Sequence, residues 1–176
     1  LRIGERYEGE KAKLNNVTIS NVYAEVPAGK PDAGYEYEGP VEDLPRNISP
    51  ASITGLPGQY VTNVTLKNIT IVYPGGGNPN YAKVGTDAKS LNAIPEMPKA
   101  YPEFSQFKEL PAWGFYIRHA KGITFDNVTL TAEKPDYRPA IVLDDVHGGD
   151  LENVTINDPG KKKNEIVVFQ STDIKK

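Results

Sequence analysis

Cysteine is absent from the 176 residues, and the sequence has only one methionine and one tryptophan. Without cysteine the protein can form no disulfide and can use no thiolate for catalysis or metal binding, although an oxidising compartment is not excluded. Long hydrophobic runs are also missing. None approaches the roughly 18 residues that a membrane-spanning helix needs, so no membrane is expected as a partner.

Charge of one sign is not in large excess. The formal net charge is −3, with 20 Lys and Arg against 23 Asp and Glu, which gives no electrostatic attraction to nucleic acid or anionic lipid.

The 15 prolines and 16 glycines recur too often to leave a long helix. The length suits a single domain over residues 1–176. Because the chain begins in what reads as mid-strand, with Leu1-Arg2-Ile3-Gly4, we expect part of the protein to precede it.

One internal repeat dominates the sequence. Four segments share the pattern apolar, any residue, Asn-Val-Thr, apolar; they are residues 14–19, 61–66, 125–130 and 151–156. β-branched valine and threonine favour strands, and asparagine tolerates the left-handed backbone region. Each unit therefore predicts two short strands that meet in a bend at the asparagine.

The spacing of the repeat indicates a solenoid. Asn127 and Asn153 are 26 residues apart, which fits one turn of a β-solenoid, whereas Asn16 to Asn63 spans 47 residues and Asn63 to Asn127 spans 64. Because equivalent turns of a solenoid stack, we expect these four asparagines to form a side-chain ladder, about 4.7–4.9 Å apart where the turns are adjacent.

The two longer gaps contain Pro- and Gly-rich stretches, which we interpret as insertions near residues 27–50 and 74–112. Insertions in a solenoid lie on its outside and often frame the binding face. A β-sandwich is the alternative fold, but a sandwich needs no motif that recurs at the same place in each unit.

Four further runs have a distinctive sequence. They are RNISPASITGLPG at residues 46–58, IVYPGGG at 71–77, LPAWGFYIRH at 110–119 and RPAIVLDDV at 138–146. These runs resemble the C-terminal third of bacterial glycoside hydrolases of family 28, in the variant common in gut and soil Bacteroidetes. That family contains polygalacturonases and rhamnogalacturonan hydrolases, and the resemblance covers nearly the whole chain.

The resemblance implies an all-β fold, a right-handed parallel β-helix of the pectate-lyase-like type, of which this chain would form the C-terminal turns with long loop insertions. It implies inverting hydrolysis of α-linked galacturonosyl bonds by carboxyl groups about 6.5–9.5 Å apart. The expected partners are acidic plant polysaccharide (pectin) or its oligosaccharides, and the rest of the β-helix on the N-terminal side. The protein would be a secreted or periplasmic bacterial one, with no cofactor and no metal.

The family's catalytic motifs are absent from this sequence. The family carries an Asn-Thr-Asp segment, an Asp-Asp pair, a Gly-His-Gly and an Arg-Ile-Lys, and none occurs here in recognisable form. We therefore assign no catalytic residue and expect the catalytic carboxylates upstream. Asp144-Asp145 lies too near the C-terminal end to match the mid-chain pair, and successive strand residues point to opposite faces. We expect this doublet to leave its strand and turn at Gly148-Gly149.

Arg2, Arg6 and Tyr7 are the candidate substrate-binding residues. They lie in a stretch that looks like the turn just after the family's Arg-Ile-Lys segment, and the guanidinium fork of arginine suits carboxylated sugars. The alternative is that these side chains are solvated or cap the exposed first turn of the solenoid.

Other conspicuous residues favour structural roles. Aromatic side chains near the end of the second insertion are expected to anchor their own loop; they are Tyr101, Phe104, Phe107, Trp113 and Tyr116. The two histidines, His119 and His147, have no nucleophile elbow and no metal-ligand spacing, so we expect surface or turn positions.

Two further functions stay open beside a hydrolase whose catalytic groups lie elsewhere. The chain could be a binding solenoid that holds acidic polysaccharide without cutting it. It could also be a structural solenoid from a surface fibre, although the irregular insertions argue against the tight period of a fibre.

Overall fold

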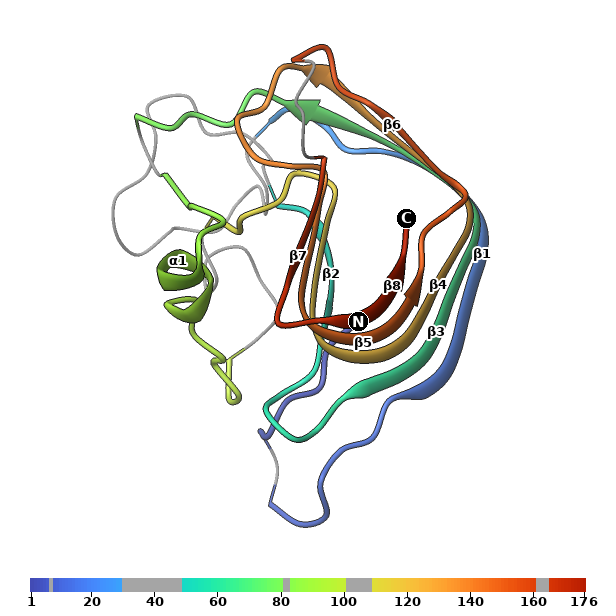
Figure 1. The fold of residues 1–176 in the computed structure, drawn as a ribbon, viewed down its shortest axis with the longest axis vertical. Coiled ribbons are helices and arrows are strands. Elements are labelled where there is room, and N and C mark those ends of the chain that lie inside the picture. Colours follow the sequence, from blue (N-terminus) through green and yellow to red (C-terminus); the bar gives the residue numbers. More distant parts are fainter. Residues whose placement is uncertain (7, 30–48, 81–82, 101–108, 161–164) are drawn as a thin grey trace.

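The computed structural model describes residues 1–6, 8–29, 49–80, 83–100, 109–160 and 165–176. This part of the chain is mostly β with almost no helix (Figure 1), which confirms the expected β composition. Its strands are β1 (Asn15–Glu25), β2 (Ala51–Thr54), β3 (Val61–Gly75), β4 (Phe115–Lys134), β5 (Ile141–Asp150), β6 (Val154–Asn157), β7 (Ile166–Phe169) and β8 (Thr172–Lys175). The short helix α1 spans Ala88–Asn92. Within the described ranges no helix has the length and apolarity to cross a membrane.

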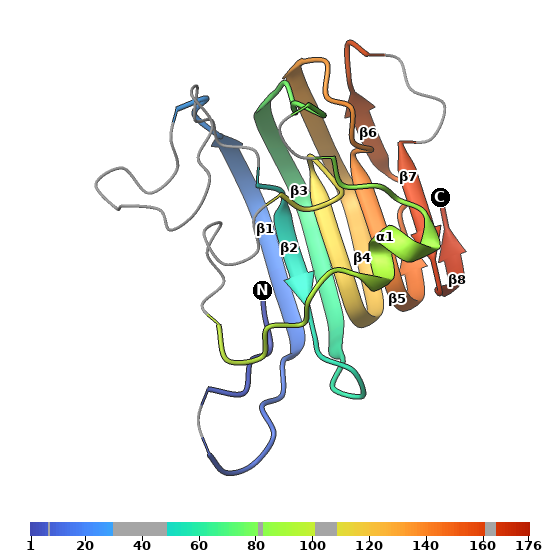
Figure 2. The same ribbon diagram turned by 90° about the vertical axis from the view of Figure 1, so that its left-hand side faces the viewer.

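The eight strands form one sheet in which all the strand pairings are parallel (Figure 2). β3 pairs with β1 on one side and with β4 on the other, and the β3–β4 register runs from Val61 opposite Ala120 to Gly75 opposite Lys134. β4 also pairs with β2, β5 and β6, and β5 pairs with β7 and β8. Neighbouring strands therefore follow the same path, one beside the next.

The long strands bend at residues that hold a left-handed backbone. In β3 these residues are Asn63, with φ 54°, and Asn68, with φ 53°. The register aligns the left-handed residues of neighbouring strands in three bend columns. The first bend column holds Asn16, Asn63, Gly122, Gly148 and Asp173; the second holds Asn21, Asn68 and Asn127; the third holds His119, Asp145 and Gln170.

Each bend explains the apolar pattern around it. Leu66 and Ile69 are both buried, while Lys67 and Asn68 between them are exposed. Regular alternation along a strand would turn one of the two polar residues inward. A left-handed residue redirects the chain instead, so that the next apolar side chain again faces the core. Asparagine and glycine tolerate this conformation at the lowest cost, which accounts for the repeated apolar-polar-Asn-apolar motif.

The asparagine ladder differs from the one expected. Asn63 lies in register with Gly122, not with Asn127. The side-chain amide of Asn127 instead donates to Asn68 Oδ1 at 2.9 Å, and the amide of Asn68 donates to Asn21 Oδ1 at 3.0 Å. The prediction of a single ladder through the four motif asparagines is therefore wrong. The same motif occurs at two different bends, and spacing alone does not distinguish them.

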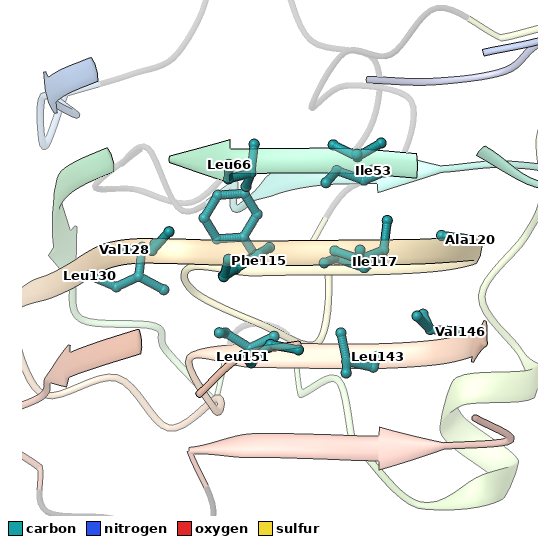
Figure 3. Packing of buried hydrophobic residues seen from close by; sticks show 14 of the residues in the cluster. Ile53, Leu66, Phe115, Ile117, Ala120, Val128, Leu130, Leu143, Val146 and Leu151 are labelled. Carbon is teal, nitrogen blue, oxygen red and sulfur yellow. The ribbon is translucent and has the colours of Figure 1, made fainter. Parts of the chain in front are cut away.

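The core lies on the inner side of the bent strands, where side chains stack from one strand to the next (Figure 3). Ile53, Ile117 and Leu143 occupy matching positions of β2, β4 and β5, and each is at most 2% exposed. The rings of Phe115 and Phe125 meet edge to face at 5.0 Å. Full burial of such side chains contributes about 1.5–3 kcal/mol each, so this apolar stack is the main source of stability.

The segment between β3 and β4 covers part of the outer face of the sheet. Leu91 of α1 is fully buried there against Ala112, Tyr116 and Val142. Figure 1 shows α1 outside the sheet, and Figure 2 shows it in front of β4 and β5 on that face. Part of the insertion expected near residues 74–112 is therefore seen outside the sheet, whereas residues 30–48 of the other insertion lie outside the described residues.

Substitution of Asn68 tests the bend. Asn68→Gly keeps the left-handed conformation but removes both amide hydrogen bonds, and we expect the free energy of unfolding to fall by about 1–2 kcal/mol. Asn68→Ala removes the same bonds and adds the cost of a left-handed alanine, about 1–2 kcal/mol more. Urea unfolding measures both variants.

The neighbouring exposed Lys67→Ala, whose ion pair with Asp126 is solvated, serves as the control and should change stability by less than about 1 kcal/mol. An Asn68→Ala variant as stable as Asn68→Gly would contradict the role of the left-handed residue.

Candidate functional site

Charged and aromatic side chains gather at the third bend column, on the outer face of the sheet. His119 and Asp145 hold left-handed φ values of 51° and 57° at matching positions of β4 and β5. Arg118 and Asp144, which precede them, are also in register. Because two consecutive residues face outward at each bend, all four side chains meet on one surface.

His119 is the centre of this group and is only 7% exposed. Its Nδ1 lies 2.6 Å from Asp145 Oδ2, and its Nε2 lies 3.1 Å from Glu96 Oε1. Burial alone would lower the pKa of His119, but the hydrogen bonds to Glu96 and Asp145 outweigh it and leave the pKa above the ordinary 6.5. A neutral imidazole has one N–H, so only the protonated ring can donate to both carboxylates.

Asp145 connects His119 to more exposed groups. Its Oδ1 accepts from His147 Nε2 at 2.8 Å and from the Tyr60 hydroxyl at 3.3 Å. Burial would raise the pKa of Asp145, but the hydrogen bonds from His119, His147 and Tyr60 hold it below the ordinary 3.8. The ammonium group of Lys121 lies 4.0 Å from the centre of the Tyr60 ring, a cation–π distance.

Arg118 and Asp144 form the buried side of the group. Arg118 Nε lies 3.2 Å from Asp144 Oδ2, and its terminal nitrogens reach Glu96 Oε1 at 2.9 Å and the Ile94 carbonyl at 2.8 Å. The Tyr116 hydroxyl donates to Asp144 Oδ2 at 3.2 Å. Asp144 is 2% exposed, and this burial raises its pKa despite the attraction of Arg118. A carboxylate enclosed in this way has no open path to a polysaccharide.

A pocket adjoins Arg118 at the edge of the segment that carries α1. Its lining includes Arg2, Thr54, Pro95, Glu96, Tyr116 and Arg118. Two arginines and one glutamate give it a mixed charge, and the Arg118 guanidinium is already bound to acidic and carbonyl oxygens. The pocket therefore combines charged groups with an apolar lining that includes Ile94, Pro95 and Leu110, and residues 94–96 bound it on one side.

The structure places two of the three candidate substrate-binding residues. Arg2 lines the pocket, where its guanidinium donates to the carbonyls of Glu96, at 3.0 Å, and of Met97. Arg6 is exposed, and Tyr7 lies outside the described residues. Arg2 thus holds the chain at residues 96–97, and substrate binding by the three residues stays a prediction.

Two expectations for single residues need correction. His119 is at a bend, as expected, but it is a buried residue between two carboxylates and not a surface histidine. The Asp144-Asp145 doublet does not leave its strand, because β5 continues to Asp150 and bends at Asp145 itself. The left-handed residue suspends the alternation of faces, so both aspartates point outward.

The aromatic anchors are confirmed where they are described. Trp113 is 1% exposed and Tyr116 is 2% exposed. The Trp113 ring meets the Tyr73 ring edge-on at 5.7 Å. The other three aromatic residues of that prediction, at positions 101, 104 and 107, lie outside the described residues.

The sequence contained a signal for part of this site. His119 and Asp145 are separated by 26 residues, the spacing of Asn127 and Asn153, and each lies eight positions before its asparagine. Extending the 26-residue period beyond the asparagine motif would have paired them. Glu96 lies in an insertion outside the repeat, so no period predicts its position.

The group can hold and exchange protons along alternating carboxylates and imidazoles, from Glu96 through His119 and Asp145 to His147. Within the described part of the chain, no set of three or more His, Asp and Glu side chains has an arrangement that would hold a metal ion. In comparisons with known proteins, no family model, no curated protein and no solved structure matches the chain significantly.

Asp145→Asn tests how much this group contributes to stability. At pH 7 we expect the free energy of unfolding to fall by about 1.5–3 kcal/mol, because hydrogen bonds to a charged group are lost. The pKa of Asp145 is lowered in the folded state. Its contribution to stability is therefore complete above about pH 4 and disappears as the pH falls through the folded-state pKa. Urea unfolding between pH 3 and 7 should show a difference that shrinks at the acid end.

The matched control is Asp126→Asn, whose ion pair with Lys67 is exposed and should contribute less than about 1 kcal/mol. The hydrogen bonds assigned to Asp145 would be contradicted if Asp145→Asn lost no more free energy of unfolding than the control. They would also be contradicted if that loss grew as the pH fell.

Proposed function

We propose that this chain is the C-terminal part of a right-handed parallel β-helix in a pectin-degrading glycoside hydrolase of the polygalacturonase type. Its substrate would be acidic plant polysaccharide or its oligosaccharides, cleaved with inversion at α-galacturonosyl links. The protein would be secreted or periplasmic, and the rest of the β-helix would lie on the N-terminal side of this chain.

The observation that carries the proposal is the stacking of parallel strands with their bends in register. In the third bend column, Asp145 follows His119 by 26 residues and Gln170 follows Asp145 by 25. A right-handed crossover is the rule for parallel strands of one sheet. Aligned bends at a spacing of about one solenoid turn support this fold, since each turn of a solenoid must repeat the path of the last.

The runs that resemble family 28 hydrolases supply the link to pectin. Some residues of these runs are buried in the structure. Arg138 is 1% exposed and donates to Asp136 at 2.9 and 3.0 Å, and Trp113 is almost fully buried. Buried residues determine the fold of this chain, and both the family and its activity are inferred from the resemblance of the runs.

The catalytic carboxylates would lie upstream of this chain. The doublet Asp144-Asp145 is the nearest match in the sequence, but Asp144 is buried against Arg118 and Tyr116, and Asp145 binds two histidines. An inverting pair needs one carboxyl group free to protonate the leaving oxygen and another free to activate water. Neither aspartate is free for these roles.

A binding solenoid is the second candidate function. The pocket that Arg2 and Arg118 line favours it, because two guanidinium groups suit an acidic sugar and binding there needs no catalytic pair. Calorimetric titration of the chain with oligogalacturonides would separate the candidates. Absence of heat at millimolar ligand would remove the binding function.

Assay of hydrolysis tests the main proposal. We expect the 176-residue chain to release no reducing ends from polygalacturonate or rhamnogalacturonan, and the protein with its natural upstream sequence to release them from at least one. Reducing-end assays on both proteins measure this directly. Activity of the 176-residue chain would refute the upstream location of the carboxylates, and inactivity of the longer protein on both substrates would refute the hydrolase.

A second test concerns the edge of the sheet at β1. Val17, Ile19 and Val22 point toward the core but are only partly buried, and β1 pairs with β3 alone among the described strands. Such an edge can pair with another chain. We expect the 176-residue protein to associate through β1 and its melting temperature to rise with protein concentration.

Ile19→Lys, which places a charge on the inner side of the edge, should abolish this association, whereas Thr18→Lys on the outer side should retain it. Sedimentation of the three proteins is the measurement. A monomer with a high melting temperature that is independent of concentration would contradict the open edge.

A further inference from the structure

We propose that His119 is a proton-operated clasp that fixes residues 94–98 to the outer face of the sheet. The clasp closes when the imidazole is protonated and loosens when it is neutral. This inference rests on the geometry of the third bend column and does not depend on the proposed activity.

The clasp consists of one imidazole between carboxylates from two separate segments. His119 Nε2 faces Glu96 Oε1 at 3.1 Å, and His119 Nδ1 faces Asp145 Oδ2 at 2.6 Å. Glu96 belongs to the segment that follows α1, and Asp145 belongs to β5. The protonated ring donates to both and joins the segment to the sheet. The neutral ring has one N–H and must release one of the two carboxylates.

Asp145 is the partner that the neutral ring would keep. Its contact with His119 is the shorter one, and His147 and the Tyr60 hydroxyl also hold it in place. The Glu96 contact is the longer one, and Glu96 lies in a segment outside the named strands and helix. Loss of the proton therefore weakens the bond to Glu96 first.

The other charged groups around His119 limit the movement. Arg118 beside it holds Glu96 Oε1 at 2.9 Å, and Arg2 holds the Glu96 and Met97 carbonyls. Asp144 faces Arg118, and Lys121 lies over Tyr60. With these contacts in place, deprotonation loosens the segment without detaching it.

The direction of the pH effect follows from the folded-state pKa of His119, which lies above 6.5. While Asp145 is ionised, the contribution of the clasp is complete below pH 6.5 and disappears as the pH rises through the folded-state pKa of His119. Residues 94–96 form one wall of the pocket that Arg2 and Arg118 line. Mildly acid conditions would therefore keep that wall in place, and mildly alkaline conditions would loosen it.

Met97 provides a specific reporter, because it is the only methionine of the protein and lies inside the clasped segment. The experiment labels the methionine methyl group with ¹³C in the 176-residue protein and follows its resonance by NMR from pH 5 to 9. We expect one sigmoidal change of the chemical shift, with its midpoint at a pH above 6.5, which is the ordinary pKa of histidine. The shift should be lost in His119→Gln.

Two further variants keep the test decisive if His119→Gln fails to fold. Glu96→Gln retains His119 but removes the charged partner, and should lower the midpoint of the shift or abolish it. His147→Gln removes the other histidine and should leave the shift in place. A Met97 resonance that does not change from pH 5 to 9 would overturn the clasp. So would a shift that keeps its midpoint in Glu96→Gln and disappears in His147→Gln.

Discussion

The structure depends on residues that hold a left-handed backbone at matching positions of parallel strands. At each of these residues the chain changes direction while both flanking apolar side chains stay on the core side, as Leu66 and Ile69 do around Asn68. The bends must coincide from strand to strand, because a strand that bent one residue earlier would lose its register and expose its apolar face. Hydrogen bonds between the side chains of the second bend column join neighbouring bends directly.

The sequence was sufficient to predict strands that bend at asparagines of the motif, as at Asn16, Asn63 and Asn127, because both the strands and these bends follow from local chemistry. It was not sufficient to predict which bends stack. Asn63 and Asn127 sit in identical motifs, yet Asn63 lies beside Gly122, because the same motif occurs at two different bends. The insertion between β3 and β4 interrupts the period that would distinguish them. Glycine performs the same function as asparagine at Gly122 and Gly148, and a search for asparagine does not find it.

The candidate site is a consequence of the same geometry. A bend turns two consecutive residues outward, so a polar pair such as Arg118 and His119 meets its counterpart on the next strand. The loop residue Glu96 completes the group from outside the repeat. Taken alone, each histidine predicts a surface or turn position, and alternation of faces predicts opposite directions for Asp144 and Asp145. That rule fails where the backbone is left-handed. The proposed hydrolase and the proposed clasp both rest on this stacking.

The most direct test of the stacking is a set of nuclear Overhauser effects between side-chain amides in the 176-residue protein. The aligned bends require cross-peaks from the Asn127 amide to Asn68 and from Asn68 to Asn21, with the Asn63 amide close to Gly122. Detection of these contacts would establish the register on which the fold and the site depend. Cross-peaks from Asn127 to Asn63 in their place would contradict it.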